Sequence, residues 1–199
     1  RAASEWDPDP RADPQAPPIE RSRDAASLSP ASESLAMVGS RAASPEHSPV
    51  ALLSNSMLGG GAERVMAILA NELAARGIPV DLLLIHATGE YLKQLSPSVN
   101  IVDLPASRIA TSVLPIASYL RRAKPRGLLA TLTSVNLAAL LAHRLARSGA
   151  RLVLREATTL SMTARDGRGS KARLLPHLAK HAYPHADRIV AVSQGVALD

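Results

Sequence analysis

Three consecutive glycines, Gly59, Gly60 and Gly61, stand just before Glu63 and Arg64, where a segment with helical periodicity begins. Glycine lets the backbone turn tightly and lets a ligand approach closely. The first N–H groups of a helix, at the positive end of its dipole, bind anions. This combination predicts a loop that binds phosphate. The alternative is that the glycines only form a tight turn.

Two better-known phosphate motifs do not fit this loop. A dinucleotide fingerprint that starts at Gly59 requires glycine at position 64, where the chain has Arg64. A P-loop requires Gly-Lys followed by Ser or Thr, and no such triplet occurs in the sequence. The loop therefore predicts neither a nicotinamide enzyme nor a P-loop NTPase, and we expect no cofactor.

Arg155 and Glu156 follow a short aliphatic run, on the side where a parallel sheet binds ligands. The guanidinium group of Arg155 has the fork geometry that pairs with phosphate. Glu156 has a carboxylate that could orient a hydroxyl group of a bound ligand. The alternative for both residues is an exposed salt bridge at a loop edge.

Glu63 and Ser193 complete the set of candidate substrate-binding residues, and each has a plain structural alternative. Glu63 lies in the first turn of its expected helix, where a carboxylate is favourable to the helix dipole. Ser193 follows the last aliphatic run and is a natural N-cap for a following helix. Capping is the preferred interpretation of Ser193.

A histidine cluster, His177, His181 and His185, has spacing that could suggest zinc. Zinc needs three or four ligands in fixed geometry, whereas Pro184 interrupts this run and no carboxylate lies within it. We predict a solvated basic helix face and no metal. The chain also has no cysteine, so it offers no thiolate ligand.

Alternating strand and helix patterns must position these residues. Aliphatic runs predict strands at 50–54, 80–85, 100–104, 127–132, 151–155 and 188–192. Helical periodicity predicts helices at 62–76, 109–123, 135–147 and 170–182. About six strands alternating with helices predict an α/β fold with a doubly wound, mainly parallel Rossmann-like sheet.

Two of the predicted helices carry more detailed expectations. The helix at 62–76 places Val65, Ile68, Leu69 and Leu73 on one face, which we expect to be buried. Pro115 falls inside the helix at 109–123, where it predicts a kink.

The chain divides by composition into two parts. Residues 1–48 contain seven of the 15 prolines and no hydrophobic period, and they predict a disordered tail. An over-extended gene model is the alternative. Residues 49–199 form the predicted domain and carry eighteen Lys or Arg against nine Asp or Glu. This excess should attract phosphates, anionic lipid surfaces or nucleic acid, although scarce aromatics and the lack of a nucleic-acid motif argue against the last.

No membrane anchor is predicted. The most apolar stretch, residues 127–142, is short and interrupted by polar side chains, and the first residues lack the pattern of a signal peptide. We expect a cytoplasmic protein. The polar loop at 157–170, with the helix after it, could contact anionic lipid at the inner face of the plasma membrane; an ordinary solvated loop is the alternative.

The two ends of the predicted domain resemble glycosyltransferase family four. The segment from Gly60 to Val65, followed by Leu69-Ala70, Leu73-Ala74, Arg76-Gly77 and Val80, is similar to the opening of that family. The segment from Ala186 to Val196 is similar to the end of its N-terminal lobe. Between these ends the resemblance is weak.

This resemblance implies a two-lobed (GT-B) fold and a retaining hexosyltransferase. Such an enzyme moves a sugar from a nucleotide-diphosphate donor to a glycan or lipid-linked acceptor, generally without a metal. The N-terminal lobe mainly holds the acceptor, while the C-terminal lobe holds most of the nucleotide and a pair of glutamates seven residues apart. We expect that lobe to be missing here and this chain alone to be inactive. The alternatives are a non-catalytic binding module or remnant of the same fold, and another GT-B enzyme such as an epimerase.

Overall fold

Short aliphatic segments form the strands of one parallel sheet in the computed structural model, which describes residues 48–157 and 170–197. Its strands are β1 (Val50–Ser54), β2 (Val80–Leu84), β3 (Val99–Asp103), β4 (Gly127–Thr131), β5 (Arg151–Glu156) and β6 (Arg188–Ala191). They lie in the order β3-β2-β1-β4-β5-β6, and every neighbouring pair is parallel. The predicted Rossmann-like sheet is confirmed.

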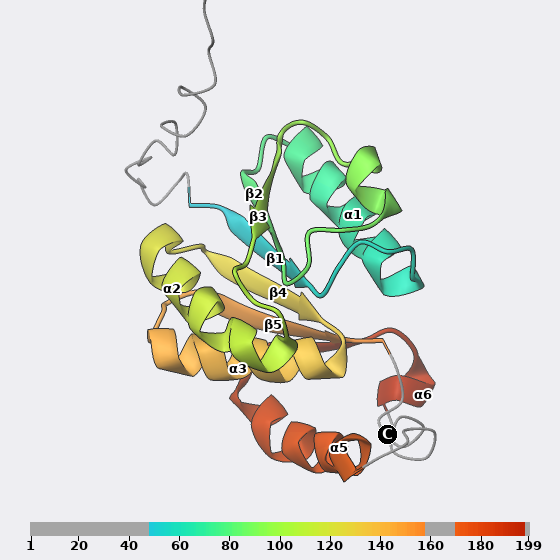
Figure 1. Cartoon of the computed structure of the whole chain (residues 1–199), viewed down its shortest axis with the longest axis vertical. Coiled ribbons are helices and arrows are strands. Elements are labelled where there is room, and N and C mark those ends of the chain that lie inside the picture. The colour runs from blue at the N-terminus through green and yellow to red at the C-terminus, as the bar shows by residue number, and fades with distance from the viewer. Residues whose placement is uncertain (1–47, 158–169, 198–199) are drawn as a thin grey trace, which may run out of the picture. The chain divides into compact units, whose positions relative to one another are not determined.

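Helices cover both faces of this sheet. They are α1 (Gly61–Ala75), α2 (Val113–Ala123), α3 (Thr133–Ala146), α5 (Ser170–Ala182) and α6 (Gln194–Ala197), with 3-10 turns η2 (Glu90–Gln94), η3 (Ile109–Ser112) and η4 (Tyr183–His185). Figure 1 shows α1 on one face, and α2, α3 and α5 on the other. Right-handed crossovers produce this division. From β1 to β3 each new strand lies closer to one edge of the sheet, and from β4 to β6 each lies closer to the opposite edge. Reversing the direction of a right-handed crossover places its helix on the other face.

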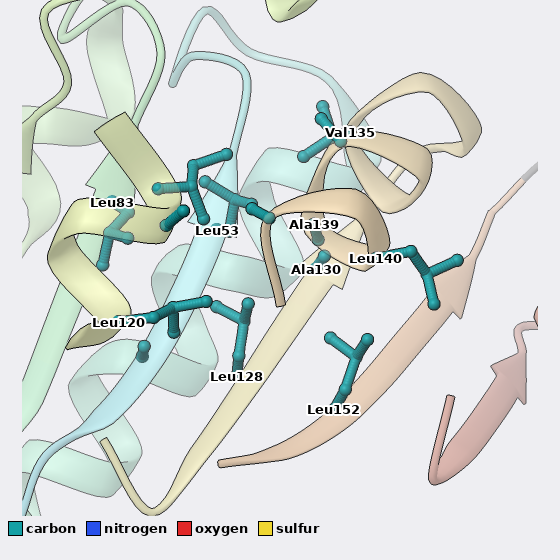
Figure 2. Close-up of a cluster of buried hydrophobic side chains, with 14 of the residues drawn as sticks. Leu53, Leu83, Leu120, Leu128, Ala130, Val135, Ala139, Leu140 and Leu152 are labelled. Atoms are coloured by element: carbon teal, nitrogen blue, oxygen red, sulfur yellow. The ribbon is translucent and has the colours of Figure 1, made fainter. Parts of the chain in front are cut away.

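Two hydrophobic clusters, one on each face, hold these layers together. Leu53, Leu128 and Leu152 of the sheet pack against Leu120 of α2 and against α3, as Figure 2 shows. The other cluster joins Leu52, Leu82 and Leu84 of the sheet to α1. Alternate residues of β1 thus belong to opposite clusters, as the pleat of a strand buried on both faces requires.

Two expectations about the helices need correction. On α1, Leu69 and Leu73 of the predicted face pack against the core, whereas Val65 and Ile68 are exposed. The buried residues of this helix are Met66, Ala67 and Ala70. Pro115 lies in the first turn of α2, because the segment before Val113 is the 3-10 turn η3. A proline in a first turn removes no intrahelical hydrogen bond, so it causes no kink there.

Two predicted segments fall outside the described residues. They are the tail at 1–48, apart from Ser48, and most of the loop at 157–170. Within the described part of the chain, no helix is long and apolar enough to cross a membrane.

Candidate functional site

The carboxyl ends of β1 and β4 lie side by side at the centre of the sheet. From β1 the chain passes to α1 on one face, and from β4 it passes to α3 on the other (Figure 1). This reversal is the topological switch point, the place where open α/β sheets bind their ligands. The residues around it are therefore the first candidates for a site.

The glycine loop after β1 presents free backbone donors at this edge. Gly59, Gly60 and Gly61 are all exposed, and Gly59 has φ +130°, a backbone conformation that other residues rarely adopt. Gly60 is the N-cap of α1, and no side chain caps this helix. The N–H groups of its first turn therefore remain available to an anion.

The carboxylate of Glu63 lies beside these donors. Its Oε2 atom comes within 2.3 Å of the place that a Cβ on Gly60 would occupy. Glycine at position 60 thus makes room for the carboxylate to fold back over the loop. The structure places Glu63 in the first turn of α1, as expected, where its charge is favourable to the dipole and would compete with an anionic ligand.

The segment after β2 supports the glycine loop from the side. Met57 N donates to Thr88 O at 2.8 Å, and Tyr91 N donates to Met57 O at 3.2 Å. Between them, Gly89 has φ +127°, and a Cβ there would lie 2.0 Å from the carbonyl carbon of Met57. The two loops touch backbone to backbone, which fixes the approach of the chain to Gly59.

Arg155 lies on the same face of the sheet as α1. Its Nη1 atom donates to Thr131 Oγ1 at 3.1 Å. Thr131 pairs with Arg155 in the register of β4 and β5. It directly follows Ala130, which pairs with Leu53 of β1. Arg155 is thus two strands from the end of β1, roughly 10 Å at the usual strand spacing. The hydrogen bond to Thr131 holds the guanidinium group at the edge of the sheet.

Glu156 lies on the opposite face, because successive residues of a strand alternate. It is 4% exposed and belongs to a polar network with side chains of α3 and η4. Thr133 Oγ1 donates to its Oε1 at 3.0 Å, Asn136 Nδ2 donates to its Oε2 at 3.4 Å, and the hydroxyl of Tyr183 donates to Oε2 as well. Arg155 and Glu156 therefore do not act at one point, and Glu156 is buried where the alternative expected an exposed salt bridge.

This network joins three elements that are far apart in sequence. Asn136 also donates to the backbone oxygen of Arg155 at 3.1 Å and lies 3.2 Å from the hydroxyl of Tyr183. Burial raises the pKa of Tyr183 above its ordinary value, and the hydrogen bond to Glu156 raises it further. The phenol therefore keeps its proton and remains a donor to the carboxylate. The end of β5, the start of α3 and the turn η4 are fixed by this set of bonds.

Comparison with known proteins decides the family. Residues 59–199 match the model of Glycosyltransferase Family 4. The chain belongs to this family. No curated protein sequence matches the chain, so the assignment stands on the family model and the fold.

Solved structures share the fold of this family-4 chain. The apo form of the lipopolysaccharide outer core galactosyltransferase WaaB superposes with a TM-score of 0.51 at 14% identity, over 74% of this chain and 40% of WaaB. Sucrose-phosphate synthase from Thermosynechococcus elongatus superposes with a TM-score of 0.54 at 14% identity, over 71% of this chain and 41% of the synthase. The chain spans about two fifths of the length of each. The likeness shows the GT-B type of fold.

The remaining candidates of the family-4 chain are Ser193 and the three histidines. Ser193 Oγ accepts from Val196 N at 3.3 Å, so Ser193 caps α6, as was preferred. His177, His181 and His185 are all exposed. In the part of the chain that the structure describes, no group of three or more His, Cys, Asp or Glu residues is placed to hold a metal ion.

Sequence reasoning did not identify Thr131, Thr133 and Asn136 as members of the site. All three are buried, and they interrupt the apolar stretch at 127–142. Polar side chains inside such a stretch were the available signal, because buried polar groups need partners. Leu132, between Thr131 and Thr133, has φ +76° and ψ +135°. This backbone conformation is rare for leucine, and strained residues of this kind cluster at active sites and ligand-binding sites.

Proposed function

We propose that residues 49–199 form the acceptor-side lobe of a retaining glycosyltransferase. This enzyme would move a sugar from a nucleotide-diphosphate sugar to a glycan or lipid-linked acceptor, without a metal. The observation that carries the proposal is the uncapped, exposed glycine loop at the switch point of a family-4 chain.

The geometry suggests how this edge would act. A nucleotide-sugar diphosphate carries negative charge that grows on the leaving group during transfer. The first-turn donors of α1 and the guanidinium of Arg155 flank the carboxyl ends of β1 and β4 on one face. Fixed donors that meet developing charge lower the barrier, because they need no rearrangement at the moment of reaction. In this proposal Glu63 moves away from the loop when the diphosphate binds, and an acceptor hydroxyl lies nearby.

The proposal also covers the setting of the enzyme. Most nucleotide contacts would come from a second lobe, and this chain alone would be incomplete and inactive. The span of about two fifths of WaaB supports this view. Glycan, exopolysaccharide or glycolipid synthesis in the cytoplasm, with peripheral contact at the inner face of the plasma membrane, would suit a lipid-linked acceptor.

A non-catalytic binding module of the same fold is the second candidate. The observation in its favour is the burial of Glu156. Its oxygens bind Thr133, Asn136 and Tyr183, so this carboxylate is engaged in holding the fold together. A module would bind a glycan or nucleotide sugar at the same edge without consuming it.

A direct assay separates the two candidates. The polypeptide encoded by the complete reading frame that contains these residues is incubated with a panel of UDP- and GDP-sugars and glycan acceptors. We expect one donor to be consumed and the product to keep the anomeric configuration of the donor, as measured by NMR. Binding of a sugar nucleotide without turnover would favour the module, and an inverted product would contradict the retaining mechanism.

Arg155→Gln is the variant that tests the site itself. We expect kcat/KM for the donor to fall about 10- to 100-fold, the usual range for losing a hydrogen bond from a charged group. Arg151→Gln is the matched control, because Arg151 begins the same strand on the same face at the other edge of the sheet. Equal losses in the two variants would show that charge alone, and not the place of Arg155, matters.

A further inference from the structure

The charge of this chain is divided between the two faces of the sheet. Between Asp103 and Arg151 the sequence has seven Lys or Arg and no Asp or Glu. This stretch contains α2 and α3 with the loops beside them, and α5, which packs against α3, also has no acidic residue. On the other face, α1 balances Glu63 and Glu72 against Arg64 and Arg76. We call the helices α2, α3 and α5 the basic layer (Figure 1).

Among the residues that the structure describes, the exposed cations of the basic layer have no acidic partners. Arg121, Arg122, Arg144 and Lys180 are exposed, and none of them forms an ion pair with another described residue. Cations in the last turn of a helix favour its dipole, and several of these residues lie in a last turn. Dipole compensation requires few charges, however, and it does not explain the apolar side chains among them.

Exposed leucines accompany these cations on all three helices. Leu114 of α2 is 66% exposed, Leu141 and Leu145 of α3 are 58% and 47% exposed, and Leu178 of α5 is 47% exposed. Leu141 and Leu145 are one turn apart and so share a face of α3, with Arg144 between them. The outer side of the basic layer therefore combines apolar and positively charged side chains.

A hollow of about 480 Å³ lies where α2 and α3 end. Arg121, Lys124, Arg126 and Arg147 line it, together with Ser148. The Oγ atom of Ser148 is buried and has no hydrogen-bond partner among the described residues. Four cations and an unpartnered hydroxyl would suit a phosphate group.

We propose that the basic layer docks on a membrane surface that contains anionic lipid. Leucines inserted among the acyl chains and cations at the headgroups together give interfacial binding that neither gives alone. The hollow at the end of α2 and α3 takes a lipid phosphate. A nucleic acid would engage the cations but would leave the leucines in water. This inference identifies the surface for the peripheral membrane contact of the proposed function, and it rests on that part of the proposal and not on the transfer reaction.

Co-sedimentation of the full chain with vesicles tests the proposal. We expect binding to phosphatidylcholine vesicles that include phosphatidylglycerol, and much weaker binding to phosphatidylcholine alone. Salt should weaken the binding without abolishing it, because salt screens the cations but not the insertion of leucine.

Two pairs of substitutions test the two parts of the surface. Arg121→Gln with Arg122→Gln should lower the vesicle partition coefficient about fivefold for each charge removed. Leu141→Gln with Leu145→Gln should lower it at least about tenfold, the factor that corresponds to burying roughly one leucine side chain. Arg64→Gln with Ile68→Gln on α1 is the matched control, because it removes an exposed cation and an exposed apolar residue from the other face.

Each contrary result has a definite meaning. Equal losses in the α1 control, or no binding to anionic vesicles by a chain whose circular dichroism shows it folded, would overturn the proposal. So would tighter binding to duplex RNA that the leucine variant leaves unchanged, or a dimer in analytical ultracentrifugation that the leucine variant dissociates. Sugar-nucleotide turnover is measured separately on the same variants, so failure of docking and failure of the transferase proposal remain distinct.

Discussion

At the scale of single residues, one glycine sets the shape of a loop it does not belong to. Gly89 follows β2, yet its backbone lies against Met57 in the glycine loop after β1. A methyl group on Gly89 would overlap the peptide of Met57 and would also be strained at φ +127°. The position of the N–H groups that would bind phosphate therefore depends on a residue thirty positions after Gly59.

We expect Gly89→Ala to lower the free energy of unfolding by about 2–5 kcal/mol, from backbone strain and overpacking together. Gly77→Ala is the control, because Gly77 has φ +73° but nothing within 4 Å of its missing Cβ. That change should cost only about 1–2 kcal/mol. Urea denaturation measures both, and equal costs would show that contact with Met57 is unimportant.

Because of two buried tyrosines, we expect the free energy of unfolding to fall at alkaline pH. Tyr119 donates to Asp81 at 2.5 Å and Tyr183 donates to Glu156. Burial, and then the adjacent carboxylate, raises the pKa of each phenol above the ordinary 10.0. The folded chain thus holds these protons more tightly than the unfolded chain does. Their contribution to stability is complete below pH 10 and falls as the pH rises above it.

Above that pH we expect the free energy of unfolding to fall by about 1.4 kcal/mol per pH unit for each tyrosine. Urea titrations from neutral to alkaline pH measure the slope. The variant with Tyr119→Phe and Tyr183→Phe has no phenol at these positions and should lose this part of the slope. An unchanged slope in that variant would assign the alkaline sensitivity to other groups.

At the scale of elements, sequence patterns predicted where helices and strands lie better than which faces they bury. The limits of β1 matched its prediction, and α1 began one residue early. The buried face of α1 was predicted only in part, since Leu69 and Leu73 pack against the core but Val65 and Ile68 are exposed. Alanine gives little signal in a periodicity based on large apolar residues, yet Ala67 and Ala70 allow α1 to approach the sheet closely.

Substitutions in α1 distinguish the two assignments of its face. Met66 is fully buried and Ile68 is 53% exposed. Met66→Ala should lower the free energy of unfolding by about 2–5 kcal/mol, because it removes side-chain atoms from a closed core. Ile68→Ala should change it by less than about 1 kcal/mol. Thermal or urea unfolding compares them, and the reverse order would restore the face predicted from the sequence.

At the scale of the whole molecule, contacts between segments distant in sequence form the part of the candidate site that sequence patterns did not predict. The glycine loop and Arg155 were found from local patterns, because strand ends and glycines are local features. The network around Glu156 was not found, since Tyr183 lies 27 residues further on and Asn136 lies 20 residues earlier. Strand alternation, which is a local rule, is enough to place Arg155 and Glu156 on opposite faces of the sheet.

The central place of β1 also has a consequence for the time course of synthesis. β1 pairs with β2 on one side and with β4 on the other, yet β4 begins about 70 residues after β1 ends. At the usual speed of translation, a ribosome needs roughly 4–15 s to make that length. During this interval one edge of a strand made of aliphatic residues stands without its partner. A nascent chain of this design would need a chaperone, or rapid collapse onto α1, to keep that edge from pairing with a neighbouring polypeptide.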